Sequence, residues 1–439
     1  MTFINQARAV VDQAELYAMQ RRVIQVRFAE GALDLVAHRN ASACALRVIA
    51  GGKLGASYAE APSKRLLDDA RETAAFGQPA QFSFAQEQTY EAPPRFDPAT
   101  AELTAGDLID VAVDVRDRIA RAAPDAVVSL VCEAESGRRS VETTGGAAAD
   151  EPFSRVTLGV RVPFASRGTN VGATARWFSP GPAVVADAWL DGLLERRDWG
   201  QAASVPESGR WPVLLMPYAS SLLTLTLATC LSSDSVAKGA SPLAAKLGER
   251  ILSERLTIRE DPAHQESPYG RSFDDEGVAV RPRTIIDRGT LTGFLTDLRG
   301  AAELGQAPTG NAARRTMFSE KIEDVPTPGW LGAIIEPGEP SWRTLLGEIE
   351  EGILVTRMSG LHSSNLLQGQ YAVHVDGFHV RGGKPIGYLE RTMLAGNVFE
   401  DFMALRGISC ECEPTARKEM EVAGLAPYML LDSAQVTVG

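Results

Sequence analysis

The acidic run at residues 274–276 is the first group in this sequence that could do chemistry. Asp274, Asp275 and Glu276 are consecutive and Gly277 follows them. Neighbouring carboxylates can act as a general acid and base, or can bind a cation. An Asp-Asp-Glu-Gly run before an apolar alternating stretch is also typical of a hairpin turn. The turn interpretation is the favoured one, and the catalytic interpretation is the alternative.

The segment at residues 359–365 gathers a second set of functional groups. It reads Ser-Gly-Leu-His-Ser-Ser-Asn, so it brings the imidazole of His362 and the amide of Asn365 together with several hydroxyls. Such a loop could orient a bound peptide. It could equally satisfy its own backbone, because Asn and Ser side chains hydrogen-bond to nearby main-chain groups. Sequence alone favours this structural role.

Metal ligation has weaker support. A zinc helix needs two histidines on one face with a glutamate base between them, and no pair of the five histidines has that spacing on a helix. Histidines and cysteines do recur late in the chain, but Cys410 and Cys412 have a spacing that is not usual for zinc. An independent metal enzyme is therefore a third hypothesis. Its candidate ligands are His362, His374, His379 and Cys410.

Composition limits the class of protein. The 439 residues are 44% hydrophobic and 23% charged, as in an average globular protein, and the net charge is −12. That charge disfavours nucleic acid and anionic membranes as partners. No apolar run is long enough to span a bilayer, and the first residues lack a secretory pattern. Five cysteines form no disulfide framework, so we expect a cytoplasmic protein.

The pattern of the first half predicts a helix followed by an antiparallel meander. Apolar residues at helical spacing predict a helix over residues 4–21. Alternating residues and Glu-Gly and Gly-Gly turns then predict strands through residues 24–59. Further helices are expected over residues 63–75, 106–121 and 183–197.

The second half is richer in short strands. A polar stretch at residues 201–209 predicts a boundary between an N-terminal domain, residues 1–202, and a C-terminal domain, residues 203–439. Helices are expected over residues 218–231 and 242–253, followed by strands with glycine turns. The predicted class is α+β, with a helix-plus-antiparallel-sheet domain and a strand-rich domain of barrel or sandwich type.

The segment 309–314 is expected to form a tight turn in which Asn311 takes a positive φ and Arg314 reaches back.

Several short motifs follow one another along the C-terminal half. They are residues 210–215, 238–243, 246–249, 273–277, 309–314 and 359–362, with Asn365, Gly369 and residues 395–397. In type and order they resemble the motifs of the TldD/PmbA family. The resemblance covers nearly the whole chain and is carried mainly by the C-terminal half.

The resemblance implies that this chain is the subunit type without zinc. TldD-type members carry a His-Glu-x-x-x-His helix and a later cysteine ligand, whereas PmbA (TldE)-type members lack them. When the sequence is aligned on residues 234–236, Thr224 and Thr229 stand where the two histidines would be, and Leu225 stands where the glutamate would be. Two hydroxyls and an aliphatic side chain cannot hold zinc or act as a base. We therefore expect no catalytic residue, metal or cofactor in this chain.

The same resemblance implies a partner. A TldD-type subunit would supply the zinc, and this chain would shape a channel for a peptide substrate. Candidate channel residues are His362, Asn365, Asp274, Asp275 and Glu276. The alternative is a pseudoenzyme that forms a homodimer and binds peptides without cutting them.

Overall fold

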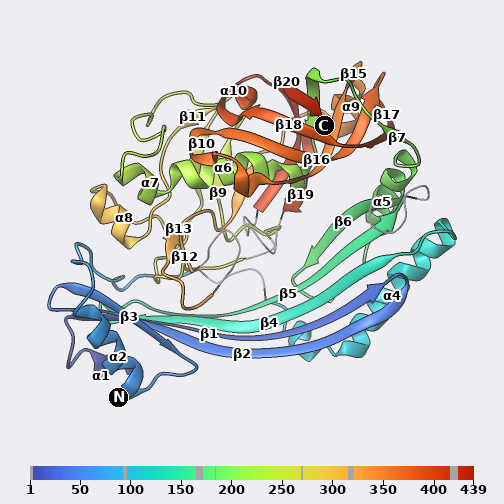
Figure 1. The fold of residues 1–439 in the computed structure, drawn as a ribbon. Coiled ribbons are helices and arrows are strands. Elements are labelled where there is room, and N and C mark those ends of the chain that lie inside the picture. Colours follow the sequence, from blue (N-terminus) through green and yellow to red (C-terminus); the bar gives the residue numbers. More distant parts are fainter. Residues whose placement is uncertain are drawn as a thin grey trace.

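Two β-sheets organise the chain, and the first is a long curved layer that lies opposite the C-terminal half (Figure 1). The structure is a computed structural model. It describes residues 3–91, 96–164, 172–182, 184–267, 270–314, 321–415 and 424–439.

The first sheet is antiparallel throughout, with strand order β3-β2-β1-β4-β5-β6. Its strands are β1 (Gln13–Ala29), β2 (Ala32–Ala50), β3 (Lys53–Ala59), β4 (Ser129–Thr143), β5 (Ala148–Pro163) and β6 (Gly172–Ser179). The helices of this half are α1 (Phe3–Ala7), α2 (Lys64–Ala74), α3 (Ala99–Glu102), α4 (Ala105–Ala122) and α5 (Asp187–Trp199).

Residues of even number on β1 face the helices, and residues of odd number face the C-terminal half. Ile24, Val26 and Phe28 share one hydrophobic cluster with Leu108 and other residues of α4. This alternation follows from the two-residue period of a strand. The opposite face is buried at Glu15, Tyr17 and Val23, so β1 is buried on both sides at residues 14–17 and 23–24.

The second sheet contains a closed circuit of strands. In the order β20-β8-β15-β16-β18, each strand pairs with the next, and β18 pairs back with β20. The strands of this half are β7 (Ala203–Ser204), β8 (Gly209–Leu215), β9 (Ile258–Glu260), β10 (Arg283–Asp287), β11 (Thr290–Leu291), β12 (Ala312–Ala313), β13 (Thr327–Pro328), β14 (Ala333–Ile335), β15 (Glu351–Ser359), β16 (Gln370–Arg381), β17 (Lys384–Leu389), β18 (Thr392–Asn397), β19 (Leu405–Thr415) and β20 (Gly424–Val438). The expected α+β class is thus confirmed, and of the two expected types, barrel or sandwich, the strand-rich half contains a barrel.

Short helices connect these strands. They are η1 (Pro217–Ser220), α6 (Ser221–Leu231), α7 (Ser233–Ala237), α8 (Leu298–Glu303), α9 (Trp342–Gly347), η2 (Leu361–Ser363), η3 (Leu366–Gln368) and α10 (Val398–Met403). Helix α6 is buried on almost every side, and its leucines belong to the main core of the C-terminal half. In the described residues, no helix combines the length and the apolar character needed to cross a membrane.

The domain boundary stays a prediction. The chain changes sheets between β6 and β7, because β7 pairs with β17 of the second sheet. The two halves nevertheless share one hydrophobic cluster, which contains Val26 and Leu158 from the first sheet and Leu354 and Phe378 from the second. This shared core holds the halves together.

Two expected helices are wrong. The helix predicted over residues 4–21 ends at Ala7, and residues from Gln13 onward belong to β1. Burial of both faces of β1 placed Leu16 and Tyr17 side by side in the core and produced an apolar spacing that resembles a helix. The helix predicted over residues 242–253 is a series of turns, and Gly248 adopts φ +82° there.

Candidate functional site

The acidic run forms a hairpin turn that also anchors two other segments. Phe273 and Ala279 form a β-bridge, and the amide of Gly277, which has φ +80°, donates to the carbonyl of Asp274 at 3.1 Å. One carboxylate oxygen of Asp274 accepts hydrogen bonds from the amides of Glu276 and Val278, at 3.0 and 2.9 Å. The turn expected from the sequence is therefore present.

The acidic turn binds the second family motif directly. The other Asp274 oxygen accepts from the amide of Ala312 at 3.0 Å, and Asp275 accepts from the amide of Arg314 at 2.7 Å. Here one expectation is wrong, because Gly310 and not Asn311 has the positive φ, +70°. Asn311 is fully buried instead, and its amide donates to Glu260 at 3.0 Å.

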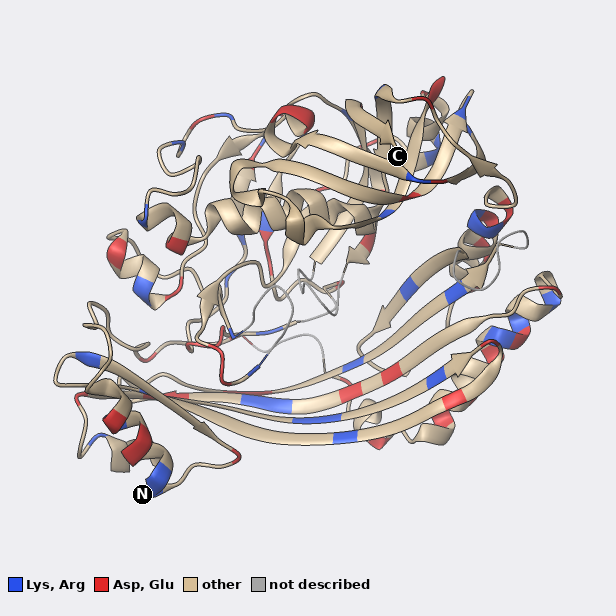
Figure 2. Cartoon of the chain, viewed as in Figure 1, with Lys and Arg blue, Asp and Glu red and all other residues tan. Residues whose placement is uncertain are grey.

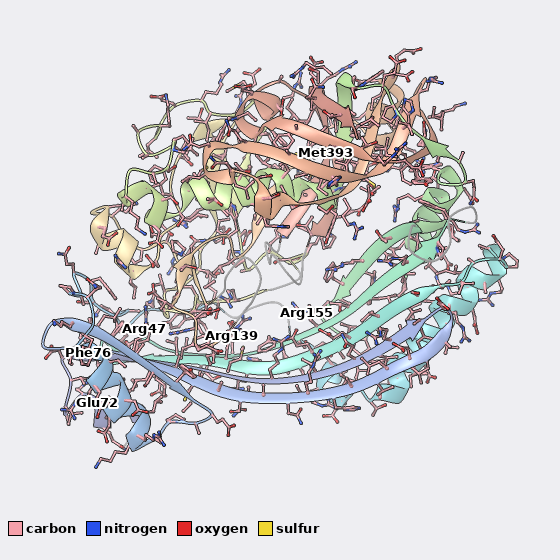
Figure 3. All side chains as sticks on the ribbon, in the orientation of Figure 1. Arg47, Glu72, Phe76, Arg139, Arg155 and Met393 are labelled. Atoms are coloured by element: carbon pink, nitrogen blue, oxygen red, sulfur yellow. The ribbon has the colours of Figure 1, made fainter. Side chains whose placement is uncertain are left out.

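Buried ion pairs connect this turn to the first sheet. Arg47 on β2 lies 2.8 Å from Glu276, and Arg314 lies 3.2 Å from Glu15 on β1. Figure 3 shows Arg47 and Arg139 along the face of the sheet that looks toward the C-terminal half. Arg139 donates to the carbonyl of Gly270 at 2.9 Å. We call residues 274–276 with their arginine partners the junction cluster.

The junction cluster has strongly perturbed proton affinities. Burial, with the nearby charge of Glu276, raises the pKa of Asp274 well above its ordinary range. Burial would also raise the pKa of Asp275, but Arg271 and Arg314 outweigh it and lower the pKa. Burial raises the pKa of Glu276 to about 7, although Arg47 opposes the shift.

The three carboxylates of the junction cluster are therefore bonded inside the chain. Asp274 and Glu276 are completely buried and Asp275 is 3% exposed. Glu276 pairs with Arg47 of the first sheet, whereas Asp274 and Asp275 bond to segments of the C-terminal half. Contact between these side chains and a peptide stays a prediction, and it would require the junction to open.

The helix that corresponds to the zinc motif offers no ligand set. The hydroxyl of Thr224 donates to the carbonyl of Ser220 at 3.3 Å, and that of Thr229 donates to the carbonyl of Leu225 at 3.0 Å. These are bonds within α6, of the kind that serine and threonine make in helices. Leu225 is 7% exposed and lies in the core. The residues present do not fit a zinc ion.

The loop that carries His362 and Asn365 lies against this same helix. The thiol of Cys230 on α6 donates to the carbonyls of Leu366 and Leu367, at 3.5 and 3.3 Å. His362 and Asn365 themselves are exposed. The fold thus brings the degenerate motif and the predicted peptide loop together, although more than 130 residues separate them. The acidic turn is not part of this pair.

The remaining candidate metal ligands do not assemble. Both ring nitrogens of His379 have protein partners, Ser204 at 2.7 Å and Glu351 at 2.8 Å. His374 and Cys410 are exposed on separate strands, β16 and β19. Within the described ranges, no three His, Cys, Asp or Glu side chains gather in a way that could hold a metal ion.

A cavity of about 1110 Å³, here called the arginine cavity, lies between the first sheet and the C-terminal half. Its floor includes Arg155 and Arg161 on β5, and its opposite wall includes Trp342, Leu354 and Tyr428. Figure 2 shows basic residues on the strands of the first sheet, and Figure 3 places Arg155 on the face toward the C-terminal half.

This cavity was not among the sites expected from the sequence, although a signal was present. On β5, Arg155, Thr157 and Arg161 line the cavity, while Val156 between the first two is buried and does not line it. Polar residues at three of the four odd positions from 155 to 161 indicate one face of a strand that is not packed in a core. The tertiary structure decides which part of the chain lies opposite that face of β5.

Two sheets, a strand circuit and a buried helix without metal ligands define a fold that matches solved proteins over the full chain. The structure is similar to that of TldE from Thermococcus kodakarensis, with a TM-score of 0.90, 22% identity and coverage of 99% of each chain. At this identity the likeness establishes the fold.

The chain belongs to the PmbA/TldA metallopeptidase family. The model of that family's C-terminal domain matches residues 208–438, more than half of the chain, and the model of its domain 1 matches residues 14–75. The family resemblance in the sequence is thereby confirmed.

Curated relatives are similar over part of their length. A zinc metalloprotease TldD homolog of Saccharolobus solfataricus is 30% identical over 208 residues, which cover 47% of this chain and 45% of that protein. An uncharacterized protein of Methanocaldococcus jannaschii is 30% identical over 192 residues, 43% of this chain and 44% of its own. The chain therefore spans less than half the length of these relatives.

Proposed function

We propose that this chain is the non-metal, TldE-type subunit of a heteromeric zinc peptidase that processes or degrades peptides in the cytoplasm. A TldD-type subunit would bring the metal. This chain would then supply the walls of the substrate channel and the contacts that align the peptide. Membership of the metallopeptidase family supports the general class of activity.

The single observation that carries the subunit assignment is the state of α6. Thr224 and Thr229 use their hydroxyls on carbonyls of their own helix, and Leu225 is packed in the core. A zinc peptidase needs ligands and a general base at its metal, and these three side chains provide neither.

The loop at His362 and Asn365 is the part of this site best placed to meet a peptide. Both side chains are exposed, whereas the loop backbone is fixed to α6 through Cys230. A rigid loop with an exposed imidazole and amide can orient a substrate that reaches the catalytic subunit. This role is part of the proposal.

The test compares the purified chain alone with the chain co-purified with a TldD-type subunit. We expect the assembled complex to cleave an unstructured peptide, and a chelator to abolish the cleavage. The chain alone should show neither stoichiometric zinc nor cleavage. Chelator-sensitive cleavage by the chain alone would refute the proposal. A stable homodimer that binds peptides and recruits no TldD-type subunit would instead support the peptide-binding alternative.

A further inference from the structure

We propose, building on the function proposed above, that the arginine cavity binds an acidic segment of an extended peptide substrate. The first support is charge. The described residues that line the cavity include eight arginines, no lysine and four acidic residues, in a chain whose net charge is −12. The lining side chains thus carry more positive than negative charge although the whole protein is acidic, and an excess of cations in a cleft attracts anions.

Most of these arginines already have acidic partners. Arg21 lies 2.5 Å from Glu135, and Arg155 pairs with the same carboxylate. Arg343 forms two hydrogen bonds with Glu195, at 2.9 and 2.7 Å. These pairs shape the cavity and leave little charge for a ligand.

Arg161 and Arg196 differ from these paired arginines in the surroundings of their guanidinium groups. Among the described residues, neither guanidinium has an ion-pair partner, and Nε of Arg196 is buried without a hydrogen bond. Arg161 lies on β5 and Arg196 on α5, and both line the cavity while being only partly exposed. A guanidinium that has lost part of its water without gaining a partner favours a carboxylate, which it can bind with two hydrogen bonds.

Aromatic side chains make the neighbouring wall. Trp342 stacks on Tyr428 with ring centres 5.1 Å apart and planes inclined by 13°, and Trp199 meets the edge of Trp342 at 6.3 Å. These rings line the same cavity. An apolar side chain next to the acidic residue would pack there, because Trp and Tyr bury large apolar area at binding sites.

The position of strand β6 supports the proposal that the bound peptide is extended. It is the last strand of the first sheet, and Thr174, Ala175 and Arg176 from it line the cavity. An outer strand can accept a peptide as an added strand through main-chain hydrogen bonds. Nucleic acid also carries negative charge, but a net charge of −12 repels its long phosphate backbone. A short acidic peptide therefore fits the observations better.

Isothermal titration calorimetry on the full chain tests the proposal. The probe is a twelve-residue peptide with two Asp, one Glu and a central Leu. The control peptide has Asn and Gln in place of the Asp and Glu residues. A dT12 oligonucleotide is titrated as a second control ligand. We expect the acidic peptide to bind at least tenfold more tightly than its amide form at 50 mM salt, as one or two charge-assisted hydrogen bonds require.

A matched pair of double variants locates the binding. Arg161→Gln with Arg196→Gln should weaken binding of the acidic peptide roughly tenfold and leave the amide form unchanged. Arg71→Gln with Arg288→Gln removes the same charge at exposed positions away from the cavity and should have no such effect. Equal binding of the two peptides, tighter binding of dT12, or an equal loss in both variants would overturn the proposal.

The two proposals can fail separately. These titrations use the chain alone and require no cleavage. If a TldD-type complex cleaves acidic and amide peptides equally and the chain shows no acidic preference, the cavity proposal fails and the subunit proposal stands. If the chain binds the acidic peptide but no partner-dependent cleavage occurs, the subunit proposal fails and the cavity proposal stands.

Discussion

Arg47 and Glu15 lie directly opposite each other on neighbouring strands and form a buried ion pair with two hydrogen bonds. Nε of Arg47 donates to Oε1 at 2.9 Å, and Nη2 donates to Oε2 at 2.5 Å. The same guanidinium lies 2.8 Å from Glu276 in the C-terminal half. Burial would lower the pKa of Arg47, but the two carboxylates outweigh it and raise the pKa. One side chain thus joins both halves.

Removing this side chain should destabilise the protein strongly. Arg47→Ala leaves Glu15 and Glu276 buried without their shared cation, which typically costs about 3–5 kcal/mol in the free energy of unfolding. Urea unfolding at pH 7 measures the loss. Arg71→Ala, at an exposed position on α2, should change stability by roughly 0.5 kcal/mol or less. An equal, small effect of both variants would show that the junction cluster does not hold the halves together.

Glu276 should give stability an unusual dependence on pH. Its pKa in the folded state is about 7, above the ordinary value of 4.5, so folding favours the protonated form. The stabilisation is complete below pH 4.5 and is lost as the pH rises to about 7. In Glu276→Gln the side chain at this position is an amide, which does not titrate, so this pH-dependent contribution is absent. The stability of the variant relative to the natural protein should therefore rise by about 1–3 kcal/mol between pH 5 and pH 8.

Urea unfolding at several pH values between 5 and 8 measures that difference. The matched control is Glu72→Gln, because Glu72 is exposed on α2 (Figure 3). Its difference from the natural protein should not change over this pH range. A Glu276→Gln difference that stays constant from pH 5 to pH 8 would mean that Arg47 keeps Glu276 ionised throughout.

The turn at Gly310 should tolerate no side chain. Its φ is +70°, and a Cβ there would lie 2.8 Å from the carbonyl oxygen of Ala279. Gly310→Ala should cost about 2–3 kcal/mol, since both a left-handed conformation and a backbone overlap are unfavourable. Gly305 has a similar φ, +64°, but a Cβ added there would meet no atom within 4 Å. Gly305→Ala should cost only about 1 kcal/mol, and thermal or urea unfolding can resolve the difference.

The hydroxyls of α6 should be dispensable for peptidase activity. Thr224→Val and Thr229→Val keep the side-chain shape and remove groups that bond only within the helix. We expect the assembled complex to retain at least half of its chelator-sensitive turnover, with stability lowered by about 1 kcal/mol at most. A tenfold loss of turnover at unchanged stability would assign these hydroxyls a direct role at the metal or the substrate.

Local features of the fold could be predicted where one residue determines them. The helix expected over residues 63–75 is α2, and Ser63 caps it, because the Ser63 hydroxyl accepts a hydrogen bond from the amide of Leu66 at 3.2 Å. The helix expected over residues 106–121 is α4, and the Asp-Asp-Glu-Gly run is a turn. The family motifs could also be recognised in the sequence, because their order along the chain does not depend on the tertiary structure.

The sequence by itself determined the family and the absence of histidine and glutamate at Thr224, Leu225 and Thr229. Tertiary structure alone decided that Arg47 would meet Glu276, and that Arg161 and Arg196 would line one cavity. The physical reason is that periodicity reports which side of an element is buried and not what buries it. Ion pairs between residues hundreds of positions apart depend on how whole sheets pack, and that packing is a property of the complete chain.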